Sequence, residues 1–350
     1  MSRQRLRIID ANLNRAGEGL HLLEDIARLM LNDGGLAQQL KTLRHEILRG
    51  DWSFNQQLIQ ARDSEADVGI DIDVPGEARE REMPLVVVAN ARRVQEALRI
   101  MEELSKIPPI APRLDPGRFK QARFELYTIE QKLLSRLLRQ DKISRLKGLY
   151  AIIDSQALSQ RSHIKVARQL IRGGAKIVQL RDKLRGKGEL LPIAQELKAL
   201  CSEHSVLFIM NDYLDLALAA DADGLHLGQG DLPIPVARKL LPIDKILGCS
   251  VNTLEQATAA ESEGADYIAV GSIYPTSSKE KASVVGVGVL RQIKMVVNLP
   301  LVAIGGINKD NVIEVRDAGA DSVAVISAIL KADDVEEATR QIIAVLGIEK

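Results

Sequence analysis

Aromatic side chains and net charge are what this sequence most clearly lacks. Phe, Trp and Tyr make up 3% of its 350 residues, and 47 Lys and Arg balance 47 Asp and Glu, so the formal net charge is zero. Proteins that bind nucleic acid usually stack bases on aromatic rings and neutralise phosphates with a basic surface. We therefore expect no nucleic-acid partner, and no general attraction to an anionic membrane.

Cysteines and long apolar runs are also scarce. The two cysteines, Cys201 and Cys249, each lie in an apolar run, and their spacing is not that of a metal site. They indicate buried free thiols in a reducing compartment, so we expect a cytoplasmic protein. The N-terminus shows no signal-peptide pattern, and no apolar run approaches the length that spans a membrane.

The N-terminal part of the chain, up to Gln140, is rich in helix formers and contains an internal repeat. Asp10–Ile26 reads DANLNRAGEGLHLLEDI, and Val88–Leu104 reads VANARRVQEALRIMEEL. A second match relates Lys41–Ile47 to Lys120–Leu126, with a shift along the chain that is longer by a single position. Two matches at nearly the same offset predict a duplicated helix–helix unit.

The polar residues of the repeat allow two interpretations. They can serve as helix caps and ion pairs between helices, or they can form a polar site between the two halves. The sequence alone leaves both open. The polar residues that recur, each with its counterpart, are Asn12 and Asn90, Arg15 and Arg93, Glu18 and Glu96, Glu24 and Glu102, Lys41 and Lys120, Arg44 and Arg123, and Glu46 and Glu125.

From Gly148 onward, short apolar runs alternate with amphipathic helical segments. Eight such units in about 200 residues are typical of a small (β/α)8 TIM barrel, with a doubly wound sheet as the alternative. The regular spacing favours the closed barrel. The runs are Leu149–Ile153, Ile177–Leu180, Val206–Met210, Gly224–Leu227, Ile246–Cys249, Tyr267–Val270, Leu301–Ile304 and Ser322–Ile326.

A group of hydrogen-bond donors follows the second run. Gln179, Arg181 and Lys183 lie on the same side of an extended strand, because successive side chains alternate. Arg binds phosphate with two parallel hydrogen bonds, and Lys acts as a point charge. The pattern therefore predicts an anionic substrate at the carboxyl end of this strand.

Two carboxylates follow the next two runs. Asn211 and Asp212 come directly after Val206–Met210, and Asp231 follows Gly224–Leu227. Because barrel strands end at one face, these carboxylates should lie near each other. One or two carboxylates plus substrate phosphate oxygens are what Mg²⁺ prefers, so we expect Mg²⁺ at Asp212 and Asp231.

A second anion site is expected at the ends of strands seven and eight. Gly305-Gly306 follows one run, and Ser327 follows the other. TIM barrels often bind phosphate there through backbone N–H groups. Thr276–Lys279, with three hydroxyls and a Lys, could form a loop that closes over a phosphorylated substrate. Two anion sites beside a metal predict group transfer with a diphosphate leaving group.

The motifs of residues 146–350 resemble those of thiamine-phosphate synthase (thiamine-phosphate pyrophosphorylase), and they cover the barrel in order. The resemblance implies condensation of 4-amino-5-hydroxymethyl-2-methylpyrimidine diphosphate with a thiazole phosphate, giving thiamine phosphate and pyrophosphate. In chain order the motifs are Gln179–Lys183, Asn211-Asp212, His226–Asp231, Gly248–Ser250, Gly271–Thr276, Gly305–Ile307 and Ile326–Ile329.

The resemblance also implies roles for single residues. Arg181, Lys183, Ser250 and Lys279 would act in catalysis, and Asp212 and Asp231 would bind Mg²⁺. The pyrimidine diphosphate would be held by Gln179, Arg181, Lys183, Asn211, Ser250 and Lys279, and Leu180 and Asp182 of the same motif are also assigned to substrate binding. The thiazole phosphate would be held by Thr276, Ser277, Ser278, Gly306, Ile326 and Ser327.

Two alternatives stay open for the barrel: a thiazole tautomerase, which shares the fold but not the full diphosphate apparatus, and a phosphate-ligand-binding barrel without turnover. We expect small-molecule substrates as partners, and the sequence leaves open whether the chain forms a homo-oligomer. We expect three segments: a helical domain over residues 1–125, a helical linker over 126–145 and the barrel over 146–350.

Asp10–Ala16 and Leu43–His45 resemble a domain fused ahead of this synthase in cyanobacteria. A similar stand-alone family is described as an alternative hydroxymethylpyrimidine-phosphate kinase. The chain up to Gln140 carries no Gly-x-x-x-x-Gly-Lys-Ser/Thr loop, however. The N-terminal domain is therefore either such a kinase or an assembly domain.

Overall fold

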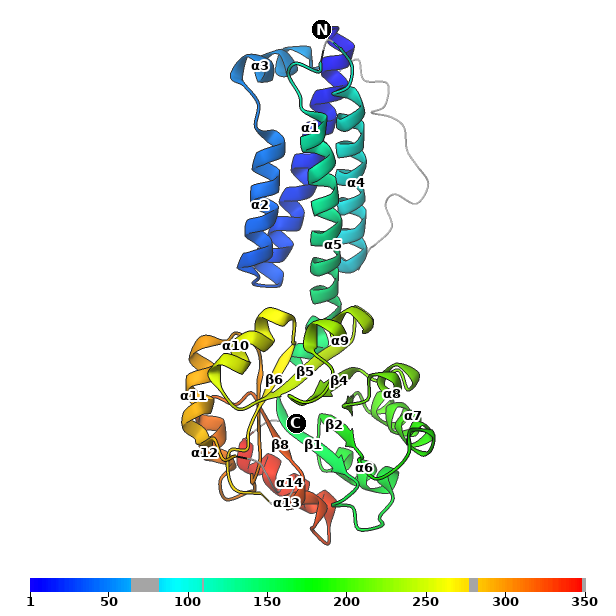
Figure 1. Cartoon of the computed structure of the whole chain (residues 1–350), viewed down its shortest axis with the longest axis vertical. Coiled ribbons are helices and arrows are strands. Elements are labelled where there is room, and N and C mark those ends of the chain that lie inside the picture. Colours follow the sequence, from blue (N-terminus) through cyan, green and yellow to red (C-terminus); the bar gives the residue numbers. More distant parts are fainter. Residues whose placement is uncertain (64–81, 109, 277–282, 348–350) are drawn as a thin grey trace. The chain divides into compact units, whose positions relative to one another are not determined.

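The computed structural model describes residues 1–63, 82–108, 110–276 and 283–347 (Figure 1). The chain divides into two compact units, Met1–Leu138 and Arg139–Lys350. The division falls inside the segment 126–145 that the sequence analysis treats as a linker. None of the described helices is long and apolar enough to cross a membrane.

The first unit is a bundle of helices. Ser2, Asp33 and Asp51 cap three of them, each accepting a hydrogen bond from a backbone N–H of the first turn. In Figure 1, α1, α2, α4 and α5 run side by side, and α3 lies at one end of the bundle. The elements are α1 (Arg3–Asp25), a π-helical turn (Ile26–Met30), α2 (Gly34–Leu48), α3 (Trp52–Ala61), α4 (Met83–Leu104) and α5 (Pro116–Ser144).

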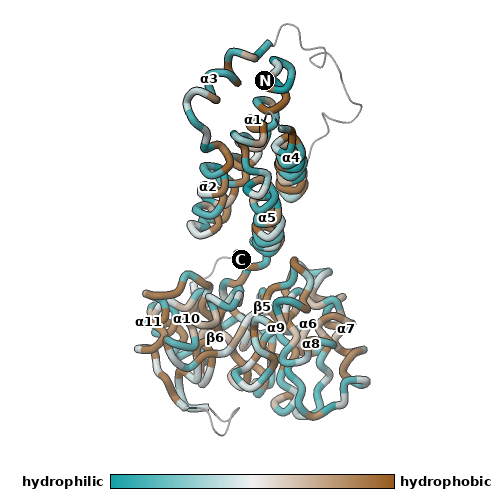
Figure 2. Tube along the Cα trace, turned by 45° about the horizontal axis from the view of Figure 1, so that its top comes forward, coloured by the Kyte–Doolittle hydropathy of each residue, from teal (hydrophilic) through white to brown (hydrophobic). Residues whose placement is uncertain are grey.

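The two copies of the repeat occupy equivalent helices. The first matched pair of segments lies largely on α1 and α4, and the second lies on α2 and α5. Apolar residues of α1 and α4, including Leu20, Leu23, Leu98 and Met101, are fully buried in the bundle core. Apolar residues recur among polar ones along these helices (Figure 2), as expected for helices with one buried face.

The second unit is the predicted TIM barrel. Eight parallel strands close in sequence order, and β1 pairs with both β2 and β8. The strands are β1 (Gly148–Asp154), β2 (Ile177–Arg181), β3 (Leu207–Asn211), β4 (Gly224–Leu227), β5 (Ile246–Val251), β6 (Tyr267–Val270), β7 (Leu301–Ile304) and β8 (Ser322–Val325).

Helices surround the barrel (Figure 1). Alternation along each strand separates two cores: Leu149 and Ala151 pack in the outer core with the helices, whereas Tyr150 and Ile152 fill the barrel interior. The helices are α6 (His163–Arg172), α7 (Lys187–Glu203), α8 (Leu214–Ala219), α9 (Ile234–Leu240), α10 (Leu254–Glu263), α11 (Gly286–Val296), α12 (Val312–Asp317), α13 (Ser327–Leu330) and α14 (Val335–Leu346).

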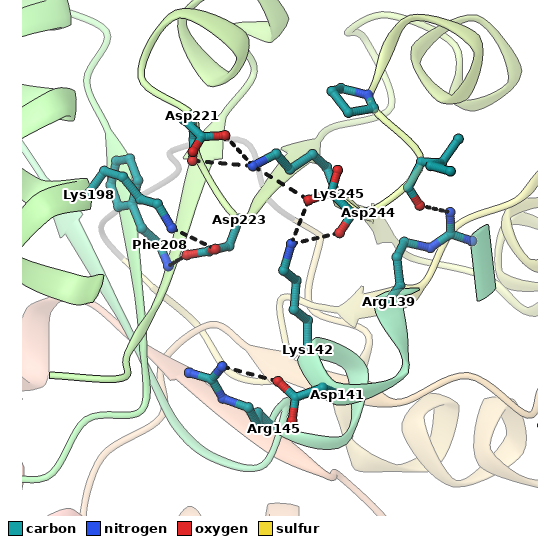
Figure 3. A network of polar contacts seen from close by, with 12 residues as sticks. Arg139, Asp141, Lys142, Arg145, Lys198, Phe208, Asp221, Asp223, Asp244 and Lys245 are labelled. Atoms are coloured by element: carbon teal, nitrogen blue, oxygen red, sulfur yellow. Dashed lines mark hydrogen bonds and ion pairs between the residues drawn. The ribbon is translucent and has the colours of Figure 1, made fainter. Parts of the chain in front are cut away.

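The last turns of α5 belong to the barrel unit and close its base. Ile143 packs against the interior core, and Lys142 Nζ pairs with Asp244 at 3.1 Å (Figure 3). Arg139 is buried, donates to the Ile243 carbonyl at 3.1 Å and pairs with Asp266 at 2.9 Å. These contacts lie at the amino ends of the strands, which leaves the carboxyl ends open to ligands.

Candidate functional site

The carboxyl ends of the strands surround a cavity of about 750 Å³. This is the face on which TIM-barrel active sites occur, and the volume suits two small substrates. Eight of the residues expected to bind substrate line the cavity: Gln179, Arg181, Asn211, Ser250, Thr276, Gly306, Ile326 and Ser327.

A chain of hydrogen bonds through the barrel interior supports one side of the cavity. Gln179 Nε2 donates to the Tyr150 hydroxyl at 3.0 Å, and this hydroxyl lies 3.0 Å from that of Tyr267. His226 links Tyr267 to Ser250, with contacts of 3.1 Å at Nδ1 and 3.0 Å at Nε2. Burial raises the pKa of both tyrosines, so they stay neutral phenols that hold Gln179 and Ser250 in fixed positions.

Arg181 is positioned by an ion pair with Asp154. The two residues are partners in the β1–β2 register, and both side chains are largely buried. A guanidinium has five N–H donors, so one carboxylate does not use them all. Arg181 lines the cavity, where its remaining donors suit an anion.

Three residues assigned to the substrate by resemblance, Leu180, Asp182 and Lys183, are not among those that line the cavity. The Leu180 side chain is fully buried in the outer core, because alternation turns it away from Gln179 and Arg181. Asp182 is 2% exposed and accepts hydrogen bonds from Ser155, from the backbone N–H groups of Leu184 and Arg185, and from the Arg185 guanidinium. Leu180 therefore anchors the strand in the outer core, and Asp182 stabilises the turn that follows the strand.

The Asp182 carboxylate is held ionised by these contacts. Burial by itself would raise its pKa, but the hydrogen bonds from Ser155, Leu184 and Arg185 outweigh burial and lower the pKa to about 2. Asp182 thus fixes the turn that carries Lys183 away from the strand.

Lys183, Asp212 and Asp231 lie close to one another; none of the three lines the cavity itself, but Asp212 directly follows the lining residue Asn211. Lys183 Nζ is 3.3 Å from Asp212 Oδ2, and Asp212 has a left-handed backbone, with φ of +61°. Asp231 Oδ2 accepts a hydrogen bond from the Gly228 N–H at 2.7 Å. Burial and the neighbouring Asp231 raise the pKa of Asp212, and Lys183 opposes the shift. Two carboxylates that repel each other in this way are suited to share a cation.

These two carboxylates do not form a complete metal cage by themselves. Within the part of the chain that the structure describes, no group of three or more His, Cys, Asp or Glu residues could hold a metal ion. Mg²⁺ at Asp212 and Asp231 would therefore take its other ligands from water and substrate phosphate oxygens, which is its usual mode.

Glycines bring the opposite wall of the cavity together. Gly305 and Gly306 have φ of +104° and +67°, and a Cβ on Gly306 would lie 2.5 Å from the Pro275 carbonyl oxygen. This contact places the loop after β6, with Thr276, beside the loop after β7. Ser277, Ser278 and Lys279, which the sequence also assigns to this site, lie outside the described residues.

Several residues that line the cavity were not predicted from the sequence. Tyr150 and Ile152 share a strand face and precede Asp154 by four and two positions, and Asn252 follows Ser250 by two. Period-two spacing from a known site residue would have found them. His226, the first residue of one of the matched motifs, also lines the cavity and contacts Ser250.

Comparison with known proteins gives matches over nearly the whole chain. Residues 149–329 match the family described as "Thiamine monophosphate synthase", and residues 7–132 match the "ThiD2 family". A thiamine-phosphate synthase of Nostoc sp. is 37% identical over 341 residues, with 97% of this chain and 94% of the relative covered. One from Synechocystis sp. is 39% identical over 346 residues, with 97% and 96% covered.

A solved structure also resembles the barrel. The thiamine phosphate pyrophosphorylase from Pyrococcus furiosus is 41% identical, with a TM-score of 0.54. The match covers 60% of this chain and 98% of the Pyrococcus chain.

Proposed function

The chain belongs to the thiamine-phosphate synthase family, and from that premise we propose how its residues carry out the reaction. The enzyme joins 4-amino-5-hydroxymethyl-2-methylpyrimidine diphosphate to a thiazole phosphate and releases pyrophosphate. The main support for the residue assignment is that one cavity is lined by both groups of residues: Arg181 and Asn211 from β2 and β3, and Gly306 and Ser327 from the segments after β7 and β8.

The diphosphate binds on the wall formed by β2, β3 and β5. Arg181, positioned by Asp154, and Lys183, beside Asp212, supply positive charge. Gln179 and Ser250 lie at the two ends of the interior hydrogen-bond chain and hold the pyrimidine. Lys279 belongs to the same group by resemblance. This arrangement favours the synthase over a tautomerase, which has no diphosphate to bind.

Mg²⁺ is the cation that we propose for Asp212 and Asp231. The fit rests on their oxygen donors and on the raised pKa of Asp212, which burial and the Asp231 charge cause. When bound there, Mg²⁺ would neutralise charge on the diphosphate. Lys183 contacts Asp212 and can approach the same phosphate oxygens.

The thiazole phosphate binds on the opposite wall. Thr276, Gly306, Ile326 and Ser327 line it, with Ser277 and Ser278 as further ligands by resemblance. Gly306 allows the loops after β6 and β7 to meet, because a side chain there would clash with the Pro275 carbonyl, and we propose that its backbone N–H binds the phosphate.

The reaction exchanges one bond for another. The C–O bond between the pyrimidine methylene and the diphosphate breaks, and its electron pair leaves with pyrophosphate. The aminopyrimidine stabilises the resulting methylene cation, and the thiazole nitrogen then donates its lone pair to form the C–N bond. No protein base is needed, so Arg181, Lys183 and the Ser250 wall act by positioning and electrostatics.

The test is product formation by the full-length protein with and without Mg²⁺. We expect Mg²⁺-dependent thiamine phosphate and pyrophosphate, and loss of both with EDTA. Asp212→Asn should lower kcat by at least about 100-fold while thiazole-phosphate binding persists. Arg168→Met, on an exposed residue of α6, is the matched control for Arg181→Met. Ligand binding without any product would instead support a binding protein without turnover.

For the helical unit we propose phosphorylation of the pyrimidine monophosphate, which would supply the barrel's substrate. The match of residues 7–132 to the ThiD2 family supports this activity. The experiment incubates the full chain with ATP-Mg and the monophosphate and measures ADP and pyrimidine diphosphate. Absence of transfer at saturating ATP would favour the assembly domain.

A cytoplasmic location is also proposed, supported by the free, buried thiols of Cys201 and Cys249.

A further inference from the structure

A second cavity, of about 320 Å³, lies within the helical unit between α1 and α4. Its volume is at the lower end of small-molecule sites. It is separate from the barrel cavity, and nothing in the synthase reaction uses it. Its lining consists of Asn12, Arg15, Glu18, Gly19, Asn90, Arg93, Glu96, Ala97 and Ile100.

Both halves of the internal repeat contribute matching side chains to this cavity. Asn, Arg and Glu line it from α1 at positions 12, 15 and 18, and the same three residue types line it from α4 at positions 90, 93 and 96. The helices approach closely at Gly19, where a Cβ would lie 2.5 Å from a methyl carbon of Val94. The cavity is thus built by equivalent residues of the two duplicated halves.

Other repeated charges serve the structure of each half. Arg44 on α2 pairs with Glu24 at 2.9 Å, and its counterpart Arg123 on α5 pairs with Glu102 at 3.1 Å. Each pair ties the two helices of one repeat together. The ion-pair interpretation of the repeat therefore holds for these four residues.

It does not hold for the charged residues that line the cavity. Arg15, Glu18, Arg93 and Glu96 are exposed, and across residues 1–63 and 82–138, as described, their side chains form no ion pair or hydrogen bond. Arg15 and Glu18 have the i,i+3 spacing that commonly pairs on a helix, as do Arg93 and Glu96. Two cations and two carboxylates thus remain available to a ligand.

Asn12 adds a buried acceptor to the cavity. It is 3% exposed, and its Nδ2 donates to the Ile8 carbonyl at 2.8 Å. Its Oδ1 is buried and has no hydrogen-bond partner among the described residues. Asn90 repeats the geometry, with Nδ2 donating to the Val86 carbonyl at 2.9 Å. A buried carbonyl oxygen without a partner is unfavourable unless a ligand N–H satisfies it.

We propose that this cavity binds one small phosphorylated heterocycle that carries an amino group, shared between the two halves of the repeat. Arg15 and Arg93 hold the phosphate, because paired guanidinium groups suit its oxygens. Asn12 Oδ1 accepts an N–H of the amino group, and Glu18 and Glu96 accept further N–H donors. The choice of an aminopyrimidine phosphate as the ligand to test rests on the proposed kinase function.

The experiment is calorimetric titration of the full chain with 4-amino-5-hydroxymethyl-2-methylpyrimidine phosphate, in an Arg181→Met background that weakens binding at the barrel. We expect one site per chain, with affinity at least about tenfold lower in Arg15→Gln and in Arg93→Gln. Arg15→Lys should recover part of the loss. Arg92→Gln, at an exposed neighbour that does not line the cavity, should bind like the background.

Equal binding by the Arg15→Gln, Arg93→Gln and Arg92→Gln variants, or no binding in the Arg181→Met background, would overturn the proposal. The helix content and thermal unfolding of these variants, measured by circular dichroism, should match those of the background, which shows that the helical unit still folds. Binding without phosphoryl transfer from ATP would remove the kinase function and keep the site. Transfer that is unaffected by Arg15→Gln and Arg93→Gln would keep the kinase function and remove the site.

Discussion

Gly248 on β5 faces the buried ring of Tyr267. A Cβ at position 248 would lie 2.0 Å from Cζ of that ring, far inside van der Waals contact. Tyr267 is fully buried and stacks on His226 with ring centroids 5.6 Å apart, so it cannot move without disturbing the contact to Ser250. Gly248 is thus required by the packing of the site and not by its backbone conformation.

We expect Gly248→Ala to lower the free energy of unfolding by about 1–3 kcal/mol, the usual cost of overpacking a core. It should also reduce coupling activity, because the hydrogen bond that orients Ser250 is displaced. Urea denaturation measures the first effect. Gly188→Ala on α7, where nothing lies within 4 Å of the added carbon, is the control and should be neutral or slightly stabilising. Equal stability of the two variants would contradict the packing argument.

Asn12 presents the opposite case, a residue that costs stability. Replacing it by Leu removes the buried, unpartnered Oδ1 and loses only a hydrogen bond to a carbonyl that already belongs to the helix. We expect Asn12→Leu to stabilise the ligand-free chain by about 1 kcal/mol and to weaken binding of the aminopyrimidine phosphate. Thermal unfolding with and without ligand measures both. A lower melting temperature in the ligand-free variant would count against this account.

At this scale the sequence identified the charged site residues well and the supporting ones poorly. Arg181 and Asn211 stand out because a charged or amide group after an apolar run is conspicuous. Leu180 and Asp182 were assigned to the substrate with the rest of their motif, although alternation along β2 turns them outward. Tyr150 was not assigned because a tyrosine in a strand resembles an ordinary core residue.

Among elements, the turn after β2 depends on a single carboxylate. Asp182 accepts hydrogen bonds from two backbone N–H groups and two side chains, and its pKa is lowered to about 2 from the usual 3.8. Because the pKa is lower in the folded state, the ionised form stabilises the fold. This contribution is complete at neutral pH and is lost as the pH falls from about 4 to about 2.

Asp182→Asn should therefore lower the free energy of unfolding at pH 7 by on the order of 2 kcal/mol. The difference between this variant and the wild type should shrink toward zero as the pH approaches 2. Denaturant titrations at a series of pH values measure it, with the exposed Asp333→Asn as the control. A difference that stays constant with pH would mean that the carboxylate charge is not what stabilises the turn.

Most elements could be predicted from periodicity, and the exceptions have a physical reason. The runs Tyr267–Val270 and Leu301–Ile304 coincide with β6 and β7, because both are bounded by polar or glycine residues. Helix α3 was not predicted, since its ten residues are few and Trp52 is 76% exposed. The spacing of Phe54, Leu58 and Ala61, all buried, was the available signal.

For the whole molecule, the division between the units falls inside the segment 126–145 that the sequence predicts to be a helical linker. Helix α5 is continuous over 29 residues and spans this division. Leu133 packs in the helical bundle, whereas Arg139 and Ile143 contribute to the barrel base. A change in composition marks a linker only where the chain leaves regular secondary structure. Helix α5 continues across this division, so the sequence shows no such change at the boundary.

The buried Arg139 is the strongest test of this division. Asp266 forms an ion pair with Arg139 at 2.9 Å and accepts hydrogen bonds from Arg238 at 3.0 Å and from the Leu247 N–H at 2.8 Å, and burial raises its pKa. Removing one partner of a buried charge is costly, so Arg139→Met should destabilise the barrel by about 3 kcal/mol. Scanning calorimetry should show a lower barrel transition, with Arg168→Met unchanged. An unaffected barrel would place Arg139 outside its cooperative unit.

The internal repeat also has a consequence for how the cavity between α1 and α4 could have arisen. Each half contributes one Asn, one Arg and one Glu to the cavity between α1 and α4, so a lone half could supply only one wall of it. An ancestor of half the length would have formed the cavity only by pairing with an identical copy of itself. The repeat indicates that duplication joined two such copies in one polypeptide, and Gly19 and its counterpart Ala97 mark a position at which the two walls now differ.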